Sequence, residues 1–236
     1  MAELKGKERA LYVQDMFSRI APRYDLMNRV MTGGQDLRWR REVIRLATVP
    51  AGGRLLDLGA GTGDLAREAL RQEPEANIVA ADFTLGMMRA GQGHPESPDL
   101  FWCGADALHL PFPDECFDAI VSGFLLRNVV DIRDSLKEQL RVLKAGGRWV
   151  ALDTTRPRQN LLFPFVLLHL HYIIPSLGRV LTGQADAYRY LPESTENFLL
   201  AEQLASRLSD AGFKDVGFQR YMLGTVAIHW GRKSLQ

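Results

Sequence analysis

The sequence predicts an α/β fold, with a mostly parallel seven-stranded sheet, helices on both faces and an antiparallel C-terminal hairpin. Three observations predict it. From residue 54 onward, short apolar runs alternate with helical patterns, as in parallel strands joined by helices. A glycine-rich turn separates the first of these runs from the first helix. The last two runs follow each other with no helical pattern between them, which is typical of a hairpin.

The first five apolar runs are the predicted parallel strands. They are Arg54 to Gly59, Asn77 to Phe83, Leu100 to Gly104, Phe117 to Gly123 and Arg148 to Thr154. Helical patterns lie between them at Asp64 to Arg71, Leu85 to Ala90 and Arg133 to Leu143. We expect Gly146 and Gly147 to end the third of these helices, because glycine tolerates the left-handed backbone of a helix C-terminus.

The C-terminal part is predicted to close the sheet. A helix is expected from Thr195 to Ala211, preceded by Ser194 as its N-cap. The strands Lys214 to Leu223 and Val226 to Trp230 then form a hairpin across Gly224 and Thr225.

Residues 1–236 are long enough for one well-buried domain and too short for two nucleotide-binding lobes plus a substrate domain. Two segments lie outside the predicted core. Residues 8–48 look helical and mix aromatic residues with arginines, and residues 155–194 contain the apolar run "LLFPFVLLHLHYII". We expect both to cover the open end of the sheet and the substrate.

Composition excludes several classes of function. The net charge of +1 contains no basic block, so we expect no nucleic-acid partner. The N-terminus lacks a signal peptide, and no uninterrupted apolar stretch reaches about 18 residues, which favours a cytoplasmic protein. The cysteines Cys103 and Cys116 lack metal-ligand spacing, so we expect reduced thiols and no metal.

The stretch "LLDLGAGTGDLA" places Gly59, Gly61 and Gly63 where the first strand meets the first helix. Ligands of open α/β sheets bind beyond the carboxyl ends of the strands, and glycines let the backbone approach them closely. In the dinucleotide fingerprint the third glycine comes five positions after the first, whereas here it comes four after it. Asp64 at the helix start would also repel a diphosphate. A ligand without phosphates fits this turn better.

Acidic residues end three successive strands. Asp82 ends the second strand, where a carboxylate can accept both ribose hydroxyls of a nucleoside, a role common to NAD and S-adenosylmethionine sites. Asp57 ends the first strand, and Asp106 with Ala107 follows the third, placed to meet an adenine amino group. Several carboxylates suit a cationic sulfonium ligand such as S-adenosylmethionine.

With these residues, the sequence resembles a Rossmann-like class I S-adenosylmethionine-dependent methyltransferase. More narrowly, it resembles the UbiE/MenG family of C-methyltransferases of menaquinone and ubiquinone biosynthesis. The resemblance covers nearly the whole chain. It is carried by "MFSRIAPRYDLMNRVMTGG", "LLDLGAGTGD", "ADFTLGMM", "GADALHLPFPDECFDAI", "LLRNVVD", "YRYLPES" and "GTVAIHWGRK".

The resemblance and the acidic strand ends together imply a set of cofactor contacts. They are Asp57, Gly59, Gly61, Thr62, Gly63, Asp82, Phe83, Asp106, Ala107, Ser122 and Gly123. One departure concerns the family pattern Ser-Phe-Gly-Leu-Arg-Asn, because this chain has Gly123 in place of the serine and Leu125 in place of the glycine. Ser122 would replace the missing serine contact only if the strand register shifted.

C-methylation of a hydroquinone needs a ring carbon activated by loss of a proton from the neighbouring hydroxyl, whose pKa is near 10. A positive charge within about 4–6 Å lowers such a pKa. Arg127 is the candidate for that charge, with Asn128 beside it at the end of the fourth strand. The candidate proton acceptors are Asp153, His169, His171 and Tyr188, and the sequence does not choose among them. Tyr24, Asn28, Tyr188 and Tyr190 are the candidate substrate contacts.

The resemblance implies S-adenosyl-L-methionine as cofactor and a polyprenyl quinol as substrate, with demethylmenaquinol converted to menaquinol and the ubiquinone precursor as a second substrate. The apolar run suggests peripheral contact with the inner face of the membrane. The oligomeric state stays open, with a homodimer as one option. Three alternatives are another small-molecule methyltransferase, a nicotinamide-dependent oxidoreductase and a non-catalytic binding module.

Overall fold

The computed structural model describes the chain except residues 1–5, 98, 158–160, 162, 183–184 and 236, so part of the predicted 155–194 insertion lies outside the described residues. The described residues form a seven-stranded sheet with strand order β3-β2-β1-β4-β5-β7-β6. Its strands are β1 (Arg54–Leu58), β2 (Asn77–Asp82), β3 (Phe101–Gly104), β4 (Phe117–Gly123), β5 (Leu143–Thr154), β6 (Lys214–Tyr221) and β7 (Val226–Arg232). All neighbouring strands are parallel except β7, which is antiparallel to both β5 and β6. The predicted fold class is confirmed.

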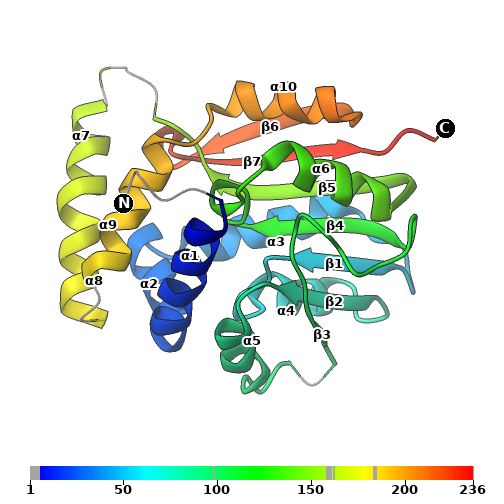
Figure 1. Cartoon of the computed structure of the whole chain (residues 1–236), viewed down its shortest axis with the longest axis horizontal. Coiled ribbons are helices and arrows are strands. Elements are labelled where there is room, and N and C mark those ends of the chain that lie inside the picture. The colour runs from blue at the N-terminus through cyan, green and yellow to red at the C-terminus, as the bar shows by residue number, and fades with distance from the viewer. Residues whose placement is uncertain (1–5, 98, 158–160, 162, 183–184, 236) are drawn as a thin grey trace.

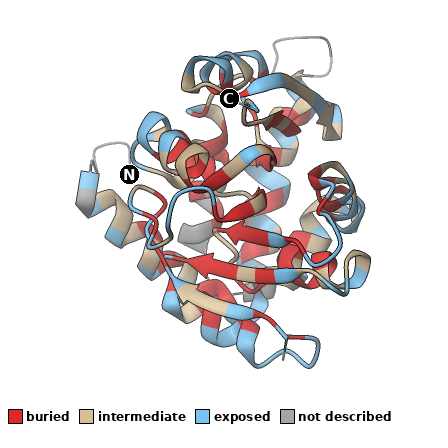
Figure 2. Ribbon diagram, turned by 90° about the vertical axis from the view of Figure 1, so that its right-hand side faces the viewer, coloured by how far each residue is buried: buried red, intermediate tan, exposed pale blue. Residues whose placement is uncertain are grey.

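Both faces of the sheet are buried, which explains why its strands appear as nearly continuous apolar runs. In β1, Leu55 packs into one core, and Leu56 and Leu58 pack into the core on the other face. The helices α3 (Gln35–Ala47) and α4 (Asp64–Gln72) cover the Leu55 side, and α6 (Ile132–Val142) and α10 (Ala201–Ala211) cover the opposite side. Figure 2 shows buried residues along the strands and exposed residues on the outer surfaces of the helices.

A third layer of helices stands beside the sheet, at the left of Figure 1. It contains α1 (Gly6–Ile20), the turn η1 (Ala21–Arg23), α2 (Tyr24–Thr32), α7 (Phe163–Leu168), the π-helical turn η3 (His169–Ile173), α8 (Ile174–Thr182) and α9 (Ala185–Glu196). These helices share a small core that includes Met16, Met27, Leu170 and Tyr188. The two segments predicted to flank the sheet therefore pack against each other.

Two predicted helix boundaries are wrong. The helix expected from Thr195 begins at Ala201, because α9 continues to Glu196 and the next helix starts after an extended Leu200, whose N–H donates to Gln203. The glycines Gly146 and Gly147 do not end a helix. The chain leaves α6 at Val142 and passes directly into β5, where an irregular stretch accommodates them. A helix α5 (Leu85–Gln92) follows β2, as predicted.

Candidate active site

A large cavity of about 470 Å³ lies where β1, β2, β3 and β4 end. Its floor is formed by strand ends and the turns that follow them, and its cover is formed by α1 and α2. Most of the predicted cofactor residues line it, namely Gly59, Gly61, Asp82, Phe83, Asp106, Ala107 and Gly123. Asp57, Thr62, Gly63 and Ser122 do not line it. The cavity also has walls of Val13, Phe17, Tyr24, Met87, Phe124, Leu125 and Asn128.

Asp82 holds the glycine-rich turn in place. Its Oδ2 accepts the N–H of Gly61 at 2.7 Å, and its Oδ1 accepts the N–H of Thr84 at 2.6 Å. Burial raises the pKa of Asp82, and these backbone N–H groups act in the opposite direction. Asp82 also accepts hydrogen bonds from the Thr84 hydroxyl and the Phe83 N–H. It lines the cavity at the end of β2, where a carboxylate can accept the ribose hydroxyls of a nucleoside. Together with Asp106, which lines the same cavity, this set of acceptors fits a nucleoside that carries a positive charge.

Asp57 braces the start of α4 and does not reach the cavity. Its carboxylate is buried and accepts the N–H of Ala66 at 3.0 Å through Oδ2. Burial raises the pKa of Asp57 to about 7, and the hydrogen bond from Ala66 acts against this shift. The predicted cofactor contact at Asp57 is thus replaced by an indirect role, in which the side chain supports the turn from below.

Replacing Asp57 with asparagine is expected to remove part of the pH dependence of folding stability. Because the pKa of Asp57 is raised from 3.8 to about 7, the folded protein binds more protons than the unfolded chain between these values. The free energy of unfolding should therefore fall as pH rises through this window, by at most about 4 kcal/mol for a shift of this size. Urea unfolding of both proteins at pH 5 and pH 8 measures this, and equal pH dependence in the two would contradict it.

Gly63 and Ser122 are placed by packing. Gly63 precedes α4 with φ +87°, and a Cβ on it would lie 2.8 Å from the ring of Trp102. The third glycine of the turn is therefore required by the backbone and by Trp102. Ser122 and Gly123 point to opposite faces of β4, and their pairing with Ala151 and Leu152 continues the register of the strand. The shift that would bring Ser122 to the cofactor does not occur.

Leu125 occupies the position where the family pattern has glycine, and it packs against the glycine-rich turn. A Cβ on Gly59 would lie 2.9 Å from Cδ1 of Leu125. Gly59 also has a φ of +73°, so its lack of a side chain serves both the turn and this contact. The Leu125 side chain narrows the large cavity beside the turn.

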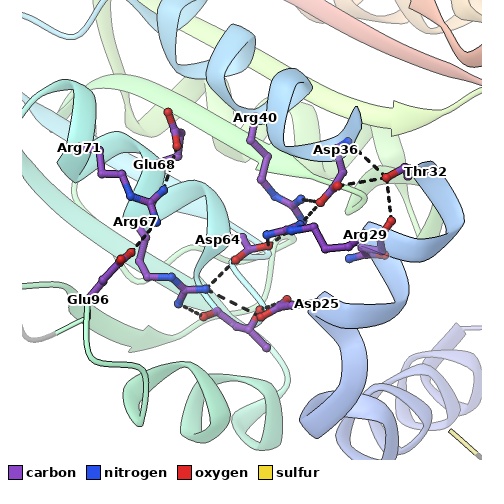
Figure 3. Close-up of polar contacts among 12 residues, drawn as sticks. Asp25, Arg29, Thr32, Asp36, Arg40, Asp64, Arg67, Glu68, Arg71 and Glu96 are labelled. Atoms are coloured by element: carbon purple, nitrogen blue, oxygen red, sulfur yellow. Dashed lines mark hydrogen bonds and ion pairs between the residues drawn. The ribbon is translucent and has the colours of Figure 1, made fainter. Parts of the chain in front are cut away.

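Ion pairs tie the glycine-rich turn to α2 and α3 (Figure 3). The Thr62 hydroxyl donates to Asp25 at 2.7 Å, and Arg67 donates to the Thr62 carbonyl at 2.6 Å. Asp64 is paired with Arg29 at 3.0 Å, Arg40 at 3.2 Å and Arg67 at 2.6 Å.

These pairs change what the sequence implied about the turn. Burial alone would raise the pKa of Asp64, but its arginine neighbours outweigh burial and lower it. The three arginines also balance the negative charge of Asp64 at the start of α4. The sequence predicts that Asp64 repels a diphosphate, and this balance of charge works against that expectation. Asp25, which accepts the Thr62 hydroxyl, was not among the predicted residues, since its only signal in the sequence is a place in an arginine-rich helical segment.

Arg127 lies in the turn η2 (Leu126–Asn128) and forms a buried ion pair. Its Nη1 lies 2.6 Å from Oδ1 of Asp153, and its guanidinium carbon lies 5.0 Å from the ring centre of Phe124. Asp153 is 1% exposed and also accepts the N–H of Thr154 at 2.7 Å. It lines neither the large cavity nor the two smaller cavities, of about 60 and 40 Å³, that Arg127 lines. Asp153 is therefore placed to hold Arg127, and its role as a proton acceptor stays a prediction.

Two smaller cavities share lining residues with the large one. The inner cavity of about 60 Å³ and the small cavity of about 40 Å³ are both lined by Arg127 and Asn28. Phe124 stands between the large and inner cavities, and Tyr24 between the large and small ones. Phe124 has a φ of +59°, a strained conformation for a bulky residue that is characteristic of functional sites.

The predicted substrate residues surround these cavities. Tyr188 and Tyr190 line the small cavity, and the Tyr190 hydroxyl donates to Oδ1 of Asn128 at 3.0 Å. The Asn128 amide donates in turn to the Phe124 carbonyl at 2.9 Å. Burial raises the pKa of Tyr24, whereas Arg127 and Asn28 act to lower it. Tyr24, Asn28, Asn128, Tyr188 and Tyr190 are thus brought together around Arg127, although they are far apart in the sequence.

The structure also separates the remaining candidate proton acceptors. His169 lines the inner cavity, whereas Nε2 of His171 lies 2.6 Å from Glu196 in an exposed pair outside these cavities. Thr154 and Thr195 line the inner cavity and were not predicted. A threonine at the end of a strand or helix has no distinctive sequence signal.

Comparisons with known proteins agree with this geometry. The model of the ubiE/COQ5 methyltransferase family matches residues 3–233. The ubiquinone/menaquinone biosynthesis C-methyltransferase UbiE of Desulfotalea psychrophila is 48% identical over 94% of this chain and 90% of its own. The demethylmenaquinone methyltransferase of Roseiflexus castenholzii is 44% identical over 96% of this chain and 95% of its own.

Among solved structures, the [4+2]-cyclase SpnF superposes with a TM-score of 0.69 at 18% identity, covering 95% of this chain and 96% of that one. At this identity the likeness shows the fold alone. The family match spans nearly the whole chain and includes the residues that form the large cavity. The chain therefore belongs to the ubiE/COQ5 methyltransferase family, and its cofactor is S-adenosylmethionine.

Proposed function

We propose that this enzyme transfers a methyl group from S-adenosylmethionine to a ring carbon of demethylmenaquinol, forming menaquinol, and that the benzoquinol precursor of ubiquinone is a second substrate. The names of the relatives support both substrates. The observation that carries the proposal is the shared wall of the cavities. Tyr24 and Phe124 each face the large cavity on one side and a cavity lined by Arg127 on the other.

The cofactor residues on the cavity wall suggest how the nucleoside is held. Asp82 would accept the ribose hydroxyls, and Asp106 with Ala107 would contact the adenine. Gly59 and Gly61 let the backbone approach the amino-acid part of the cofactor. When bound, S-adenosylmethionine supplies an electrophilic methyl group on a positively charged sulfur.

Arg127 would stabilise the phenolate that activates the ring carbon. Its guanidinium is fixed by Asp153 and by the face of Phe124, so it is already oriented before substrate binds. Orientation of this kind contributes to catalysis because no reorganisation is needed as charge develops. Tyr24 and Phe124 would position the ring, and the apolar walls exclude water from the reacting atoms.

A turnover assay tests the proposed function. The enzyme is incubated with S-adenosylmethionine labelled on its methyl group and with a short-chain demethylmenaquinol kept reduced, and we expect label in the product menaquinol. Menaquinol itself, which already carries the methyl group, is the control and should take up no label. Labelling of an unrelated phenol or amine, with none in demethylmenaquinol, would overturn the proposal in favour of another small-molecule methyltransferase.

We also propose that the enzyme takes its polyprenyl substrate from the membrane surface through an apolar stripe on α7 and η3. The stripe consists of Phe165, Leu168 and Tyr172, which are 50–68% exposed and spaced as one side of a helix. Exposed aromatic and aliphatic side chains on one helix side are typical of contact with the lipid interface. Within the described ranges, no helix is both long and apolar enough to span a bilayer.

Replacing Phe165 and Tyr172 together with serine is expected to lower partitioning onto lipid vesicles about tenfold or more, because burial of each aromatic side chain is worth about 1.5–3 kcal/mol. Co-sedimentation with phosphatidylglycerol-containing vesicles measures this. Phe101→Ser is the matched control, since Phe101 is 63% exposed on the edge strand β3, away from α7 in Figure 1. Equal partitioning of the parent, the double variant and Phe101→Ser would refute membrane contact. If the parent forms a dimer and the double variant does not, the stripe is instead a contact with a second copy of the chain.

A further inference from the structure

The inner cavity gathers buried polar atoms that have no partner among the described residues. They are Nδ2 of Asn28, Nε of Arg127, Oγ1 of Thr154, Nε2 of His169 and Oγ1 of Thr195. They come from five different parts of the chain, namely α2, η2, the end of β5, η3 and α9. Each buried polar atom without a hydrogen bond costs about 1–3 kcal/mol, so their convergence on one cavity calls for something polar inside it.

The size of the inner cavity determines what that can be. At about 60 Å³ it is several times the space needed for one water molecule, but it is far smaller than the large cavity. The other walls are apolar, with Trp39, Leu170 and Ile174 among them. Ordered water with these five polar atoms as partners would satisfy this arrangement, since a buried water makes two to four hydrogen bonds.

His169 connects this cavity with the outside of the protein. Its Nε2 is buried against the cavity, whereas the residue as a whole is only half-buried. It lies in the π-helical turn η3, and such turns occur frequently at functional sites. The same cavity is also lined by Arg127 and by Phe124, which lines the large cavity as well.

We propose that water in the inner cavity and His169 form the path by which the proton released in methylation leaves the active site. This inference rests on the proposed function. Methylation forms a C–CH₃ bond on the ring and breaks the S–CH₃ bond of the cofactor, whose electron pair stays on sulfur. The C–H bond of the same ring carbon then breaks, and its electron pair returns to the aromatic system. One proton is therefore released per methyl group transferred. It passes through the cavity water to Nε2 of neutral His169, and from the imidazole to solvent.

The charges around His169 are compatible with this role. Arg127 also lines the inner cavity, and Asp153 compensates its positive charge. Burial lowers the pKa of His169, so the imidazole is neutral and able to accept a proton at pH 7. The helices packed against η3 are α7, α8 and α9. Apart from His171 and Tyr172 on η3 itself, the titratable side chains described on these elements are Arg179, Tyr188, Tyr190, Glu193 and Glu196.

The experiment compares His169→Gln with His171→Gln, a histidine two positions away that lies outside the inner cavity and pairs with Glu196. For His169→Gln we expect kcat at pH 7 to fall at least tenfold, with KM for both substrates within about twofold of the parent. The acidic limb of its kcat profile, on which activity rises as His169 loses its proton, should disappear. His171→Gln should keep both kcat and the limb. An unchanged kcat and limb in His169→Gln would overturn the proposal.

Two further measurements test the inference even if His169→Gln does not fold or the substrate is another compound. Thr195→Val removes one cavity hydroxyl without changing charge, and we expect it to lower kcat and raise the solvent deuterium isotope effect on kcat; no change in either would count against a water path. Proton NMR titration of the cofactor-free enzyme reports the pKa of His169 directly. We expect a pKa below 6.5, and an imidazole that takes up no proton across the titration would overturn the relay. Because the titration needs no turnover, it distinguishes failure of the relay from failure of the proposed function.

Discussion

Replacing Arg127 with alanine is expected to lower kcat about 10²- to 10³-fold and to leave the affinity for S-adenosylmethionine nearly unchanged. The guanidinium is fixed by Asp153 at 2.6 Å and lies over the Phe124 ring, so it forms a preorganised positive charge beside the site proposed for the substrate ring. Removing one such group from an active site typically costs this factor in kcat. Cofactor affinity is spared because Arg127 does not line the large cavity.

The buried ion pair requires a control for stability. Alanine at position 127 leaves Asp153 charged and unpaired in the interior, which costs about 3–5 kcal/mol of folding free energy. The variant Arg127→Met with Asp153→Leu removes both charges and fills similar volume, so it should recover most of that stability. If its kcat stays low while its melting temperature recovers, the loss of turnover belongs to the missing guanidinium. Recovery of kcat together with stability would show that Arg127 is only structural.

The sheet was predictable because its signals are local. Strands that are buried on both faces contain apolar runs, which can be recognised without knowing the rest of the fold. The hairpin follows from two such runs without a helix between them. The wrong boundaries lie where local rules compete. Ser194 has the chemistry of an N-cap, yet it lies inside α9, and tertiary packing places the start of the next helix at Ala201.

The site was predictable only where it follows the strand ends. Asp82, Asp106 and the glycine-rich turn are brought together by parallel pairing, which the order of strands already implies. The partnership of Arg127 with Asp153 depends on β4 and β5 being neighbours and on the turn after β4 folding back, and no spacing in the sequence encodes that turn. The inner cavity depends on side chains from many separate elements, so its threonines could be found only in three dimensions.

The complementary result is expected for Asp82→Ala, which should weaken binding of S-adenosylhomocysteine about 10- to 100-fold. A hydrogen bond to a charged group is worth about 1.5–3 kcal/mol, and tenfold in affinity corresponds to about 1.4 kcal/mol. The variant would lose the contacts of Asp82 to the ribose. It would also lose the hydrogen bonds that the N–H groups of Gly61 and Thr84 donate to Asp82, so the glycine-rich turn becomes less ordered. Calorimetric titration of the folded variant measures the change.

Asp57→Asn is the matched control, because Asp57 is a buried carboxylate of the neighbouring strand that does not line the large cavity. It should bind S-adenosylhomocysteine as tightly as the parent, within about threefold. Together with Arg127→Ala, the two carboxylate variants locate the cofactor, because only a ligand seated in the large cavity responds to Asp82 while remaining indifferent to Asp57 and Arg127. If Asp82→Ala binds normally, the nucleoside does not lie against the end of β2, and the placement of the substrate ring beside Phe124 and Arg127 loses its basis as well.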